Sequence, residues 1–343
     1  MSLSTDAASD GLDSLSLTVN AAVDAGKIVV VAAGNEGNDD STIGSPSAAE
    51  KAITVGAVAG WSLPVAASNH SDGPYLAPFS SRGPTLSPTF FTKPDIAAPG
   101  VSVRSAKAGT TAGYVDFNGT SMATPFTAGT IALMLDADPS LTDAGVKSIL
   151  FSTAQDRGPA GKDNHWGWGL LDGYATVAEA DGAISYSPTP FPTYTTVSGS
   201  VADGGLWQYT FDLTADDLDI PIAATILIEG ETICVRMTGP ICRAIAWSPD
   251  LDTRLLDPSL TEIAASTCPF PASACGLVAQ QEVLDAMPTT AGTYTIEIFP
   301  WDGNPDNGMG GEFDVYLSTG PPFDVTPPVI SLVGLNPQTV LVG

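Results

Sequence analysis

The sequence has few basic residues. Its 343 residues include 12 Lys plus Arg against 38 Asp plus Glu, giving a formal net charge of −26. A surface of that charge repels phosphate, so we exclude nucleic-acid binding and disfavour binding to anionic lipid. No apolar run reaches the roughly eighteen residues needed to cross a bilayer, so we predict no membrane-spanning segment.

Cysteine is absent from the first 233 residues. Cys234, Cys242, Cys268 and Cys275 then fall within 42 residues, and such an even, clustered set predicts two disulfides in an exported protein. A zinc site is the alternative, but there is no C-x-x-C motif and both histidines are distant in sequence. We favour the local pairs Cys234–Cys242 and Cys268–Cys275, and the sequence leaves the two other pairings open.

The length of the chain and a change in its sequence pattern predict more than one domain. At about 150 residues per domain, the chain favours two. A proline-rich segment near residue 190 separates two sequence patterns. We predict an α/β domain over residues 1–183, an all-β domain over 184–320, and a linker with the start of a truncated immunoglobulin-like repeat over 321–343.

The first half alternates helical and strand-like patterns. Apolar residues from Leu12 to Val23 recur at helical spacing, and helices are also expected from about Ser121 and after a capping Thr142. Helices alternating with short β-branched runs are typical of a parallel α/β sheet with flanking helices. Strands covered on both faces are predicted at 28–31, 52–58 and 95–98.

The second half has the pattern of antiparallel β-structure. Apolar residues alternate with polar ones from Trp207 to Leu213, and again over 294–298 and 313–317. Short alternating strands with turn-rich connections predict an antiparallel β-sandwich.

Two stretches of the first half carry residues suited to catalysis. Ser121 opens a predicted helix, whose free N–H groups and positive dipole end stabilise nearby negative charge, and Pro125 fits the first turn. Asn35 follows the strand 28–31 directly, at the edge where open α/β sheets place their sites, and its amide can donate to an oxyanion. Taken alone, Ser121 could be a helix cap and Asn35 a turn residue.

Together, these stretches resemble the subtilisin-like serine proteases, the subtilases, over about residues 8–180. The resemblance implies that Ser121 is the nucleophile, that Asn35 is the oxyanion-hole side chain, and that Ala32, Ala33 and Gly34 line the specificity pocket. The matching motifs, in family order, are VVAAGN at 30–35, ITVGAV at 53–58, FSSRGP at 79–84, KPDIAAPG at 93–100, GTSMATP at 119–125 and GWGLLD at 167–172.

The sequence departs from the family pattern in two places. Phe126 stands where the family usually has a non-catalytic His. No segment matches the family's catalytic Asp and His motifs, and His70 and His165 lie outside such a context. We interpret the chain as a truncated piece of an active protease, and its start, Met1 to Leu3, as a remnant of cloning.

The resemblance extends more loosely to the second half. The stretches 246–252 and 288–296 resemble the pre-peptidase C-terminal-type domain that follows many secreted proteases. The family implies an extracellular protein that acts on protein or peptide substrates and needs no cofactor for its chemistry.

A structural calcium ion is a further implication of the family. Asp302, Asn304 and Asp306 could offer oxygen ligands, although a hairpin loop is the favoured explanation because Asn307 stands where an EF-hand requires glycine. Asp95 matches a calcium position of some members, but Lys93 argues against a site there.

Two functions therefore compete. The favoured one is a secreted subtilisin-like serine endopeptidase that acts through Ser121. The alternative is a non-catalytic surface-binding protein that keeps the same scaffold and uses its β-sandwich as an adhesive module.

Overall fold

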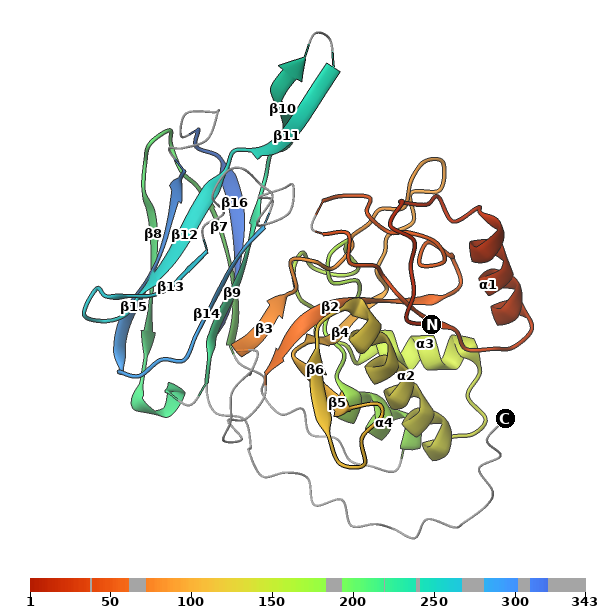
Figure 1. Ribbon diagram of the computed structural model, residues 1–343. Coiled ribbons are helices and arrows are strands. Elements are labelled where there is room, and N and C mark those ends of the chain that lie inside the picture. The colour runs from red at the N-terminus through yellow and green to blue at the C-terminus, as the bar shows by residue number, and fades with distance from the viewer. Residues whose placement is uncertain are drawn as a thin grey trace.

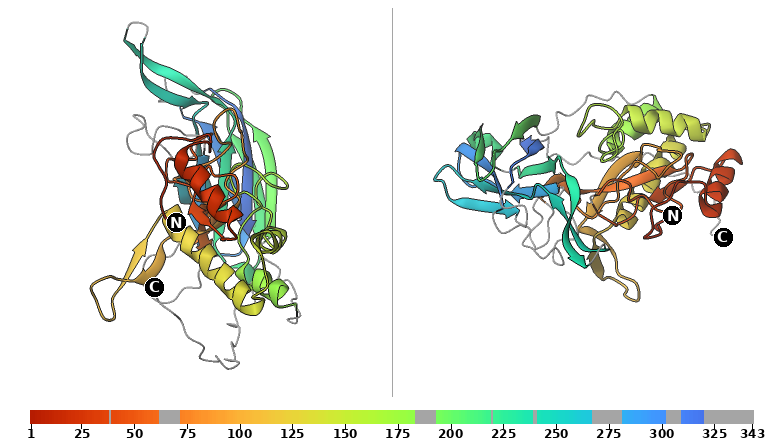
Figure 2. Two further views of the ribbon diagram at one scale, coloured as in Figure 1. Left: turned by 90° about the vertical axis from the view of Figure 1, so that its right-hand side faces the viewer. Right: turned by 90° about the horizontal axis from the view of Figure 1, so that it is seen from above.

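The computed structural model shows two parts lying side by side (Figures 1 and 2). We call residues 1–182 the N-terminal half and the two large antiparallel sheets within 193–319 the C-terminal sheet pair. The structure describes residues 1–37, 39–61, 72–182, 193–218, 220–238, 241–266, 281–301 and 309–319.

The N-terminal half is built on a mostly parallel sheet flanked by helices, as predicted. Its strands are β1 (Val30–Ala32), β2 (Ile53–Trp61), β3 (Asp72–Leu76), β4 (Ile96–Val101), and the small hairpin β5 (Val103–Ala106) with β6 (Tyr114–Phe117). Its helices are α1 (Ser14–Asp24), α2 (Thr120–Ala137), α3 (Asp143–Ser152) and α4 (Gly173–Asp181).

Strand β2 is the centre of this sheet. It pairs in parallel with β1 and with β4, and its last residues pair antiparallel with β3. The apolar runs that predicted these strands are buried, and they form one core with α2 and α3 through residues such as Val55, Ile96, Ile131 and Leu150. Because parallel strands are covered on both faces, their sequences need no polar alternation.

The helix predicted from Leu12 begins two residues later than expected, at Ser14. Asp13 caps α1 by accepting hydrogen bonds from Leu15 N and Ser16 N. Val19 is buried, but Leu12 and Leu15 are exposed, so this part of the predicted apolar face was wrong. The cap at Thr142 is confirmed, because its side chain accepts from Gly145 N.

The C-terminal sheet pair consists of two four-stranded antiparallel sheets. One has the order β13-β12-β15-β8 and the other β14-β9-β16-β7. The strands are β7 (Thr193–Ser200), β8 (Trp207–Leu213), β9 (Ile222–Ile228), β12 (Leu251–Leu256), β13 (Glu262–Ser266), β14 (Gln281–Ala286), β15 (Gly292–Pro300) and β16 (Glu312–Thr319).

A single core lies between these two sheets, and apolar side chains from both contribute to it. The alternation predicted for β8 is confirmed: Gln208, Thr210 and Asp212 are exposed, whereas the intervening aromatic residues pack against the core. The expectation of a polar outer face fails on β16, where Tyr316 and Ser318 are also buried. The N-terminal half covers that face, which local alternation cannot reveal.

A separate hairpin, β10 (Glu231–Thr238) with β11 (Ile241–Ser248), extends beyond the sheet pair (Figure 1). Its backbone register places Cys234 opposite Ile245 and Cys242 opposite Met237, so the two cysteines are not cross-strand partners. Cys268 and Cys275 lie outside the described residues, as do His70 and the calcium candidates from Asp302 to Asp306. The disulfide pairing remains a prediction.

No helix within the described ranges is long and apolar enough to cross a membrane.

Candidate active site

Helix α2 begins with an uncapped N-terminus. Gly119 precedes it with a φ of 147°, and no side chain caps the helix at that position. Gly119 N donates to Gly100 O at the carboxyl end of β4, which fixes the start of the helix beside that strand. Ser121 is the second residue of α2, so it lies at the positive end of the helix dipole.

Asn35 reaches the same point from a different strand. It follows the carboxyl end of β1 by three residues, and its side-chain oxygen accepts hydrogen bonds from Thr120 N at 2.9 Å and Thr120 Oγ1 at 3.1 Å. The amide nitrogen faces Gly119, next to Ser121. Because Thr120 engages the oxygen, the side chain is held with its N–H donors directed toward the start of α2.

The segment before Asn35 is buried and closely packed. Ala32 and Ala33 are almost fully buried, and Thr120 Oγ1 lies 3.2 Å from both Gly34 N and Gly34 O. Gly34 has a φ of 116°, and a Cβ there would lie 2.7 Å from Ser81 Oγ. Only glycine fits this position without strain, so the chain can approach α2 closely.

The first residues of the chain lie against this site. Met1 pairs with β1 through hydrogen bonds to Val30 O and from Ala32 N, at 2.5 and 3.0 Å. Ser2 Oγ donates to Ser121 O at 2.9 Å, and Ser121 Oγ lies 3.4 Å from Ser2 O.

Pro125 explains the contact between Ser2 and Ser121. It is the sixth residue of α2, not a first-turn residue as predicted. Proline has no backbone N–H, so it cannot donate to the carbonyl four residues earlier, which is that of Ser121. The Ser2 hydroxyl supplies the missing hydrogen bond.

His165 is not placed as a base for Ser121. It lies on the segment that packs beside the start of β4, where Trp168 N donates to Asp95 O, whereas Ser121 lies beside the other end of β4. Burial lowers the pKa of His165 to about 3, with a smaller contribution from the positive charge of Arg82. A neutral, buried imidazole of that pKa is a weak proton acceptor near neutral pH.

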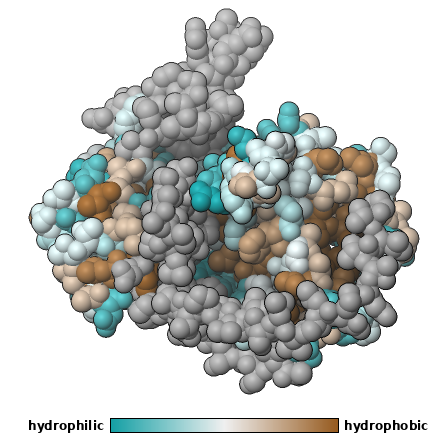
Figure 3. All heavy atoms as spheres, turned by 60° about the horizontal axis from the view of Figure 1, so that its bottom comes forward, coloured by the Kyte–Doolittle hydropathy of each residue, from teal (hydrophilic) through white to brown (hydrophobic). Residues whose placement is uncertain are grey.

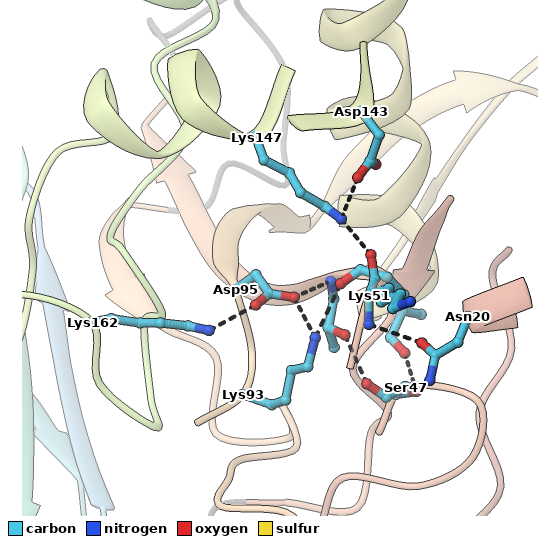
Figure 4. A network of polar contacts seen from close by, with 11 residues as sticks. Asn20, Ser47, Lys51, Lys93, Asp95, Asp143, Lys147 and Lys162 are labelled. Carbon is cyan, nitrogen blue, oxygen red and sulfur yellow. Dashed lines mark hydrogen bonds and ion pairs between the residues drawn. The ribbon is translucent and has the colours of Figure 1, made fainter. Parts of the chain in front are cut away.

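Asp95 is the centre of a buried network of polar contacts (Figure 4). One carboxylate oxygen accepts from Thr54 N at 2.8 Å and Lys93 Nζ at 2.6 Å, and the other from Lys162 Nζ at 2.8 Å. Burial acts to raise the pKa of Asp95, but the ammonium groups of Lys93 and Lys162 outweigh it and hold this pKa below its usual value.

The donor set around Asp95 does not fit calcium. Both carboxylate oxygens already accept hydrogen bonds from cationic side chains, and two positive charges repel a third cation. Across the described ranges, no group of three or more His, Cys, Asp or Glu side chains could hold a metal ion.

Residues 1–169 match the model of the subtilase family. Serine protease AprX of Bacillus subtilis (strain 168) is 43% identical over 152 residues, which is 40% of this chain and 32% of AprX. Subtilisin E of the same organism is 40% identical over 164 residues, 47% of this chain and 36% of that protein. The first half of the chain is therefore similar in sequence to subtilisins.

Other relatives share the same segment. Subtilisin-like protease SBT3.11 of Arabidopsis thaliana is 41% identical over 191 residues, 54% of this chain and 23% of that protein. This chain thus spans about a third or less of these three curated relatives. Among solved structures, Sphericase matches 50% of this chain and 56% of its own, with 31% identity and a TM-score of 0.40, too low to support a conclusion about the fold.

The family match begins at residue 1, and Met1 pairs with β1. The interpretation of Met1 to Leu3 as a cloning remnant stays a prediction. Sequence reasoning also gave no role to Thr120, although it lies within the matched serine motif. The position of Pro125 four residues after Ser121 was the available signal that Ser121 O needs an outside donor.

Proposed function

We propose that this chain is the later part of the catalytic region of a secreted subtilisin-like serine endopeptidase, joined to an accessory β-sandwich. One observation carries the proposal: Asn35 and Ser121, which are 86 positions apart in the sequence, meet at the uncapped start of α2. The similarity of residues 1–169 to the subtilase family supports it.

The arrangement suits acyl transfer. Ser121 Oγ attacks the carbonyl carbon of a peptide substrate, and the negative charge that develops on the carbonyl oxygen is stabilised by the Asn35 side-chain amide and the Ser121 backbone N–H. Thr120 holds the Asn35 amide, so its donor needs little reorganisation during the reaction. Ala32, Ala33 and Gly34 form one wall of the pocket for the substrate side chain.

The base that activates Ser121 comes from outside these 343 residues in our proposal. A serine hydroxyl is a weak nucleophile until a base within hydrogen-bond reach accepts its proton, and His165 lies by the opposite end of β4. The chain covers only 32% of AprX, which leaves room for the remaining catalytic residues.

The surface of α2 also supports a larger catalytic region. Phe126 and Leu133, seven residues apart on α2, are 46% and 59% exposed, and Tyr174 on α4 is 53% exposed. Figure 3 shows apolar surface over this part of the N-terminal half. Exposed apolar residues at helical spacing are typical of a face that another element covers.

The proposal extends to the domain boundaries and the compartment. Residues 1–183 form the catalytic part, 184–320 an accessory β-sandwich of the pre-peptidase C-terminal type, and 321–343 a linker and the start of a further repeat. Two sheets around one core support the sandwich. The similarity to subtilisins supports an extracellular protease that acts on proteins or peptides.

Reaction with a fluorophosphonate probe tests this function. We expect slow labelling of Ser121 in this chain and rapid labelling in a longer chain that includes the residues encoded upstream. Ser121→Ala in the longer chain should abolish the labelling. Failure of the longer chain to react would favour the non-catalytic surface-binding alternative. Rapid labelling of the short chain would show that a residue within these 343 residues, such as His70 or His165, acts as the base.

A further inference from the structure

The C-terminal sheet pair contacts the N-terminal half through the outer face of the sheet β14-β9-β16-β7. Every residue of β9 is buried except Leu227, which is partly exposed. Thr225 and Ser318 on the outer face are each 1% exposed. The sequence of β9, IAATILI, is apolar except for Thr225, as expected of a strand covered on both faces. This face is therefore an internal interface of the chain.

The first anchor of this interface is strand β3. Leu76 N donates to Thr225 Oγ1 on β9 at 3.0 Å, and Leu76 O accepts from Gln281 Nε2 on β14 at 2.7 Å. Both backbone groups of Leu76 are thus satisfied by side chains of the opposite part. Unpaired backbone groups at the edge of a sheet are costly when buried and prone to faulty pairing when exposed.

The second anchor is the segment of Arg157 and Gly158. Gly158 N donates to the Tyr194 hydroxyl on β7 at 2.7 Å. The Arg157 guanidinium lies 4.2 Å from the centre of the Tyr194 ring and donates to Ser318 Oγ on β16 at 3.1 Å. Arg157 is only 3% exposed, so its charge is removed from water by this contact.

The two anchors hold opposite sides of the same sheet. Leu76 contacts β9 and β14, whereas Arg157 and Gly158 contact β7 and β16, the strands on the other side. Two separated sets of buried polar contacts resist rotation about either one. Each set also leaves buried backbone N–H groups unpaired if the parts separate without water reaching them.

We propose that the C-terminal sheet pair is an integral support of the protease-like half, fixed to it by these two anchors, and that both parts unfold as one cooperative unit. The pair is not a freely moving binding module, and the outer face of β14-β9-β16-β7 is not available to an outside partner.

Calorimetry of the whole chain tests the cooperative unit. We expect one unfolding transition whose calorimetric and van't Hoff enthalpies agree. Two resolved transitions would overturn the proposal, because they would show that each part unfolds alone. The result does not depend on whether Ser121 reacts, so this proposal and the proposed function can fail separately.

Two shape-conserving variants test the anchors. Tyr194→Phe removes the acceptor for Gly158 N, and Thr225→Val removes the acceptor for Leu76 N. Each should lower the midpoint of the single transition by roughly 2–4 °C. The matched controls are Tyr209→Phe and Thr210→Val on β8 of the other sheet, and we expect them to leave the midpoint unchanged.

An unchanged midpoint in both anchor variants would also overturn the proposal, since the hydroxyls would then be facing solvent. If Tyr194→Phe fails to fold, Thr225→Val alone decides, because it changes a contact at the other anchor.

Discussion

The two ends of β4 gather polar groups in opposite ways. At its start, Asp95 is 6% exposed and both carboxylate oxygens are engaged by Lys93, Lys162 and Thr54. At its carboxyl end, Ser121 and Asn35 lie at the surface around an uncapped helix, with the Asn35 amide donor facing Gly119. Polar groups whose hydrogen bonds are all made within the protein, as at Asp95 (the closed end), stabilise the fold. Exposed donors such as the Asn35 amide (the open end) can instead bind a substrate.

The helix starts show the same difference. Asp13 caps α1, Thr142 caps α3 and Asp172 caps α4, each by accepting a backbone N–H with its own side chain. Helix α2 starts from Gly119 without such a cap. At α2 the acceptor for the first N–H comes from Asn35, a residue on another segment, and the positive end of the helix dipole there is suited to stabilising an oxyanion.

The largest effect is expected at the closed end. Lys93→Met removes one of two ammonium groups from a buried carboxylate, so we expect unfolding to become easier by about 3–5 kcal/mol in urea titrations. Lys162→Met is the control. Its side chain is 25% exposed, so the loss should be clearly smaller. Equal losses, or none, would contradict the view that Asp95 and Lys93 form the closed centre.

At the open end, the effect should fall on catalysis. Asn35→Leu in the longer, active chain removes one oxyanion donor, and we expect kcat to fall by about 10²–10³-fold with little change in KM. Unfolding should also become easier, by roughly 1–3 kcal/mol, because Thr120 N loses its acceptor. A rise in KM with kcat unchanged would reduce Asn35 to a substrate-binding or turn residue.

The sequence predicted the elements better than their surroundings. The runs at 28–31, 52–58 and 95–98 gave strands near the right places, because β-branched residues covered on both faces leave a local signal. The burial of Tyr316 on β16 depends on the other half of the chain, hundreds of residues away in sequence, and no local pattern contains it.

The candidate site divides in the same way. Ser121 and Asn35 were predicted from local motifs, and the structure brings them together through Thr120. The role of Ser2 was not predicted. Its hydroxyl donates to Ser121 O, a carbonyl that Pro125 leaves without a helical donor and that lies far from Ser2 in the sequence. Contacts of this kind become visible only when the fold places the two segments side by side.

Asp163 differs from the sites at both ends of β4: it is buried, and only one of its two carboxylate oxygens accepts hydrogen bonds. Its effect on stability should depend on pH. Burial raises the pKa of Asp163 to about 7, against the opposing hydrogen bonds from Trp166 N and His165 N. Between about pH 4 and pH 7 the folded state keeps a proton that the unfolded chain has lost. The free energy of unfolding should therefore fall as pH rises through this interval, by on the order of 4 kcal/mol, and then level off.

Asp163→Asn isolates that contribution. The amide keeps an oxygen for the two backbone donors and does not ionise, so the difference between the two urea-unfolding curves should vanish below about pH 4 and grow up to about pH 7. A difference independent of pH would show that Asp163 has the same pKa in the folded and the unfolded chain, and would contradict the prediction.

The smallest expected effect concerns the hydrogen bond from the Ser2 hydroxyl to Ser121 O. Ser2→Ala in the longer, active chain leaves Ser121 O without a donor, because Pro125 cannot supply one. One hydrogen bond of this kind contributes about 1 kcal/mol, so kcat should fall by about fivefold with KM nearly constant. Pro125→Ala restores a backbone N–H four residues after Ser121, which can donate to Ser121 O. In a chain that already carries Pro125→Ala, adding Ser2→Ala should therefore lower kcat much less than it does in the chain with Pro125. If Ser2→Ala costs the same with either residue at 125, the hydroxyl acts elsewhere, and the carbonyl of Ser121 is not what it holds.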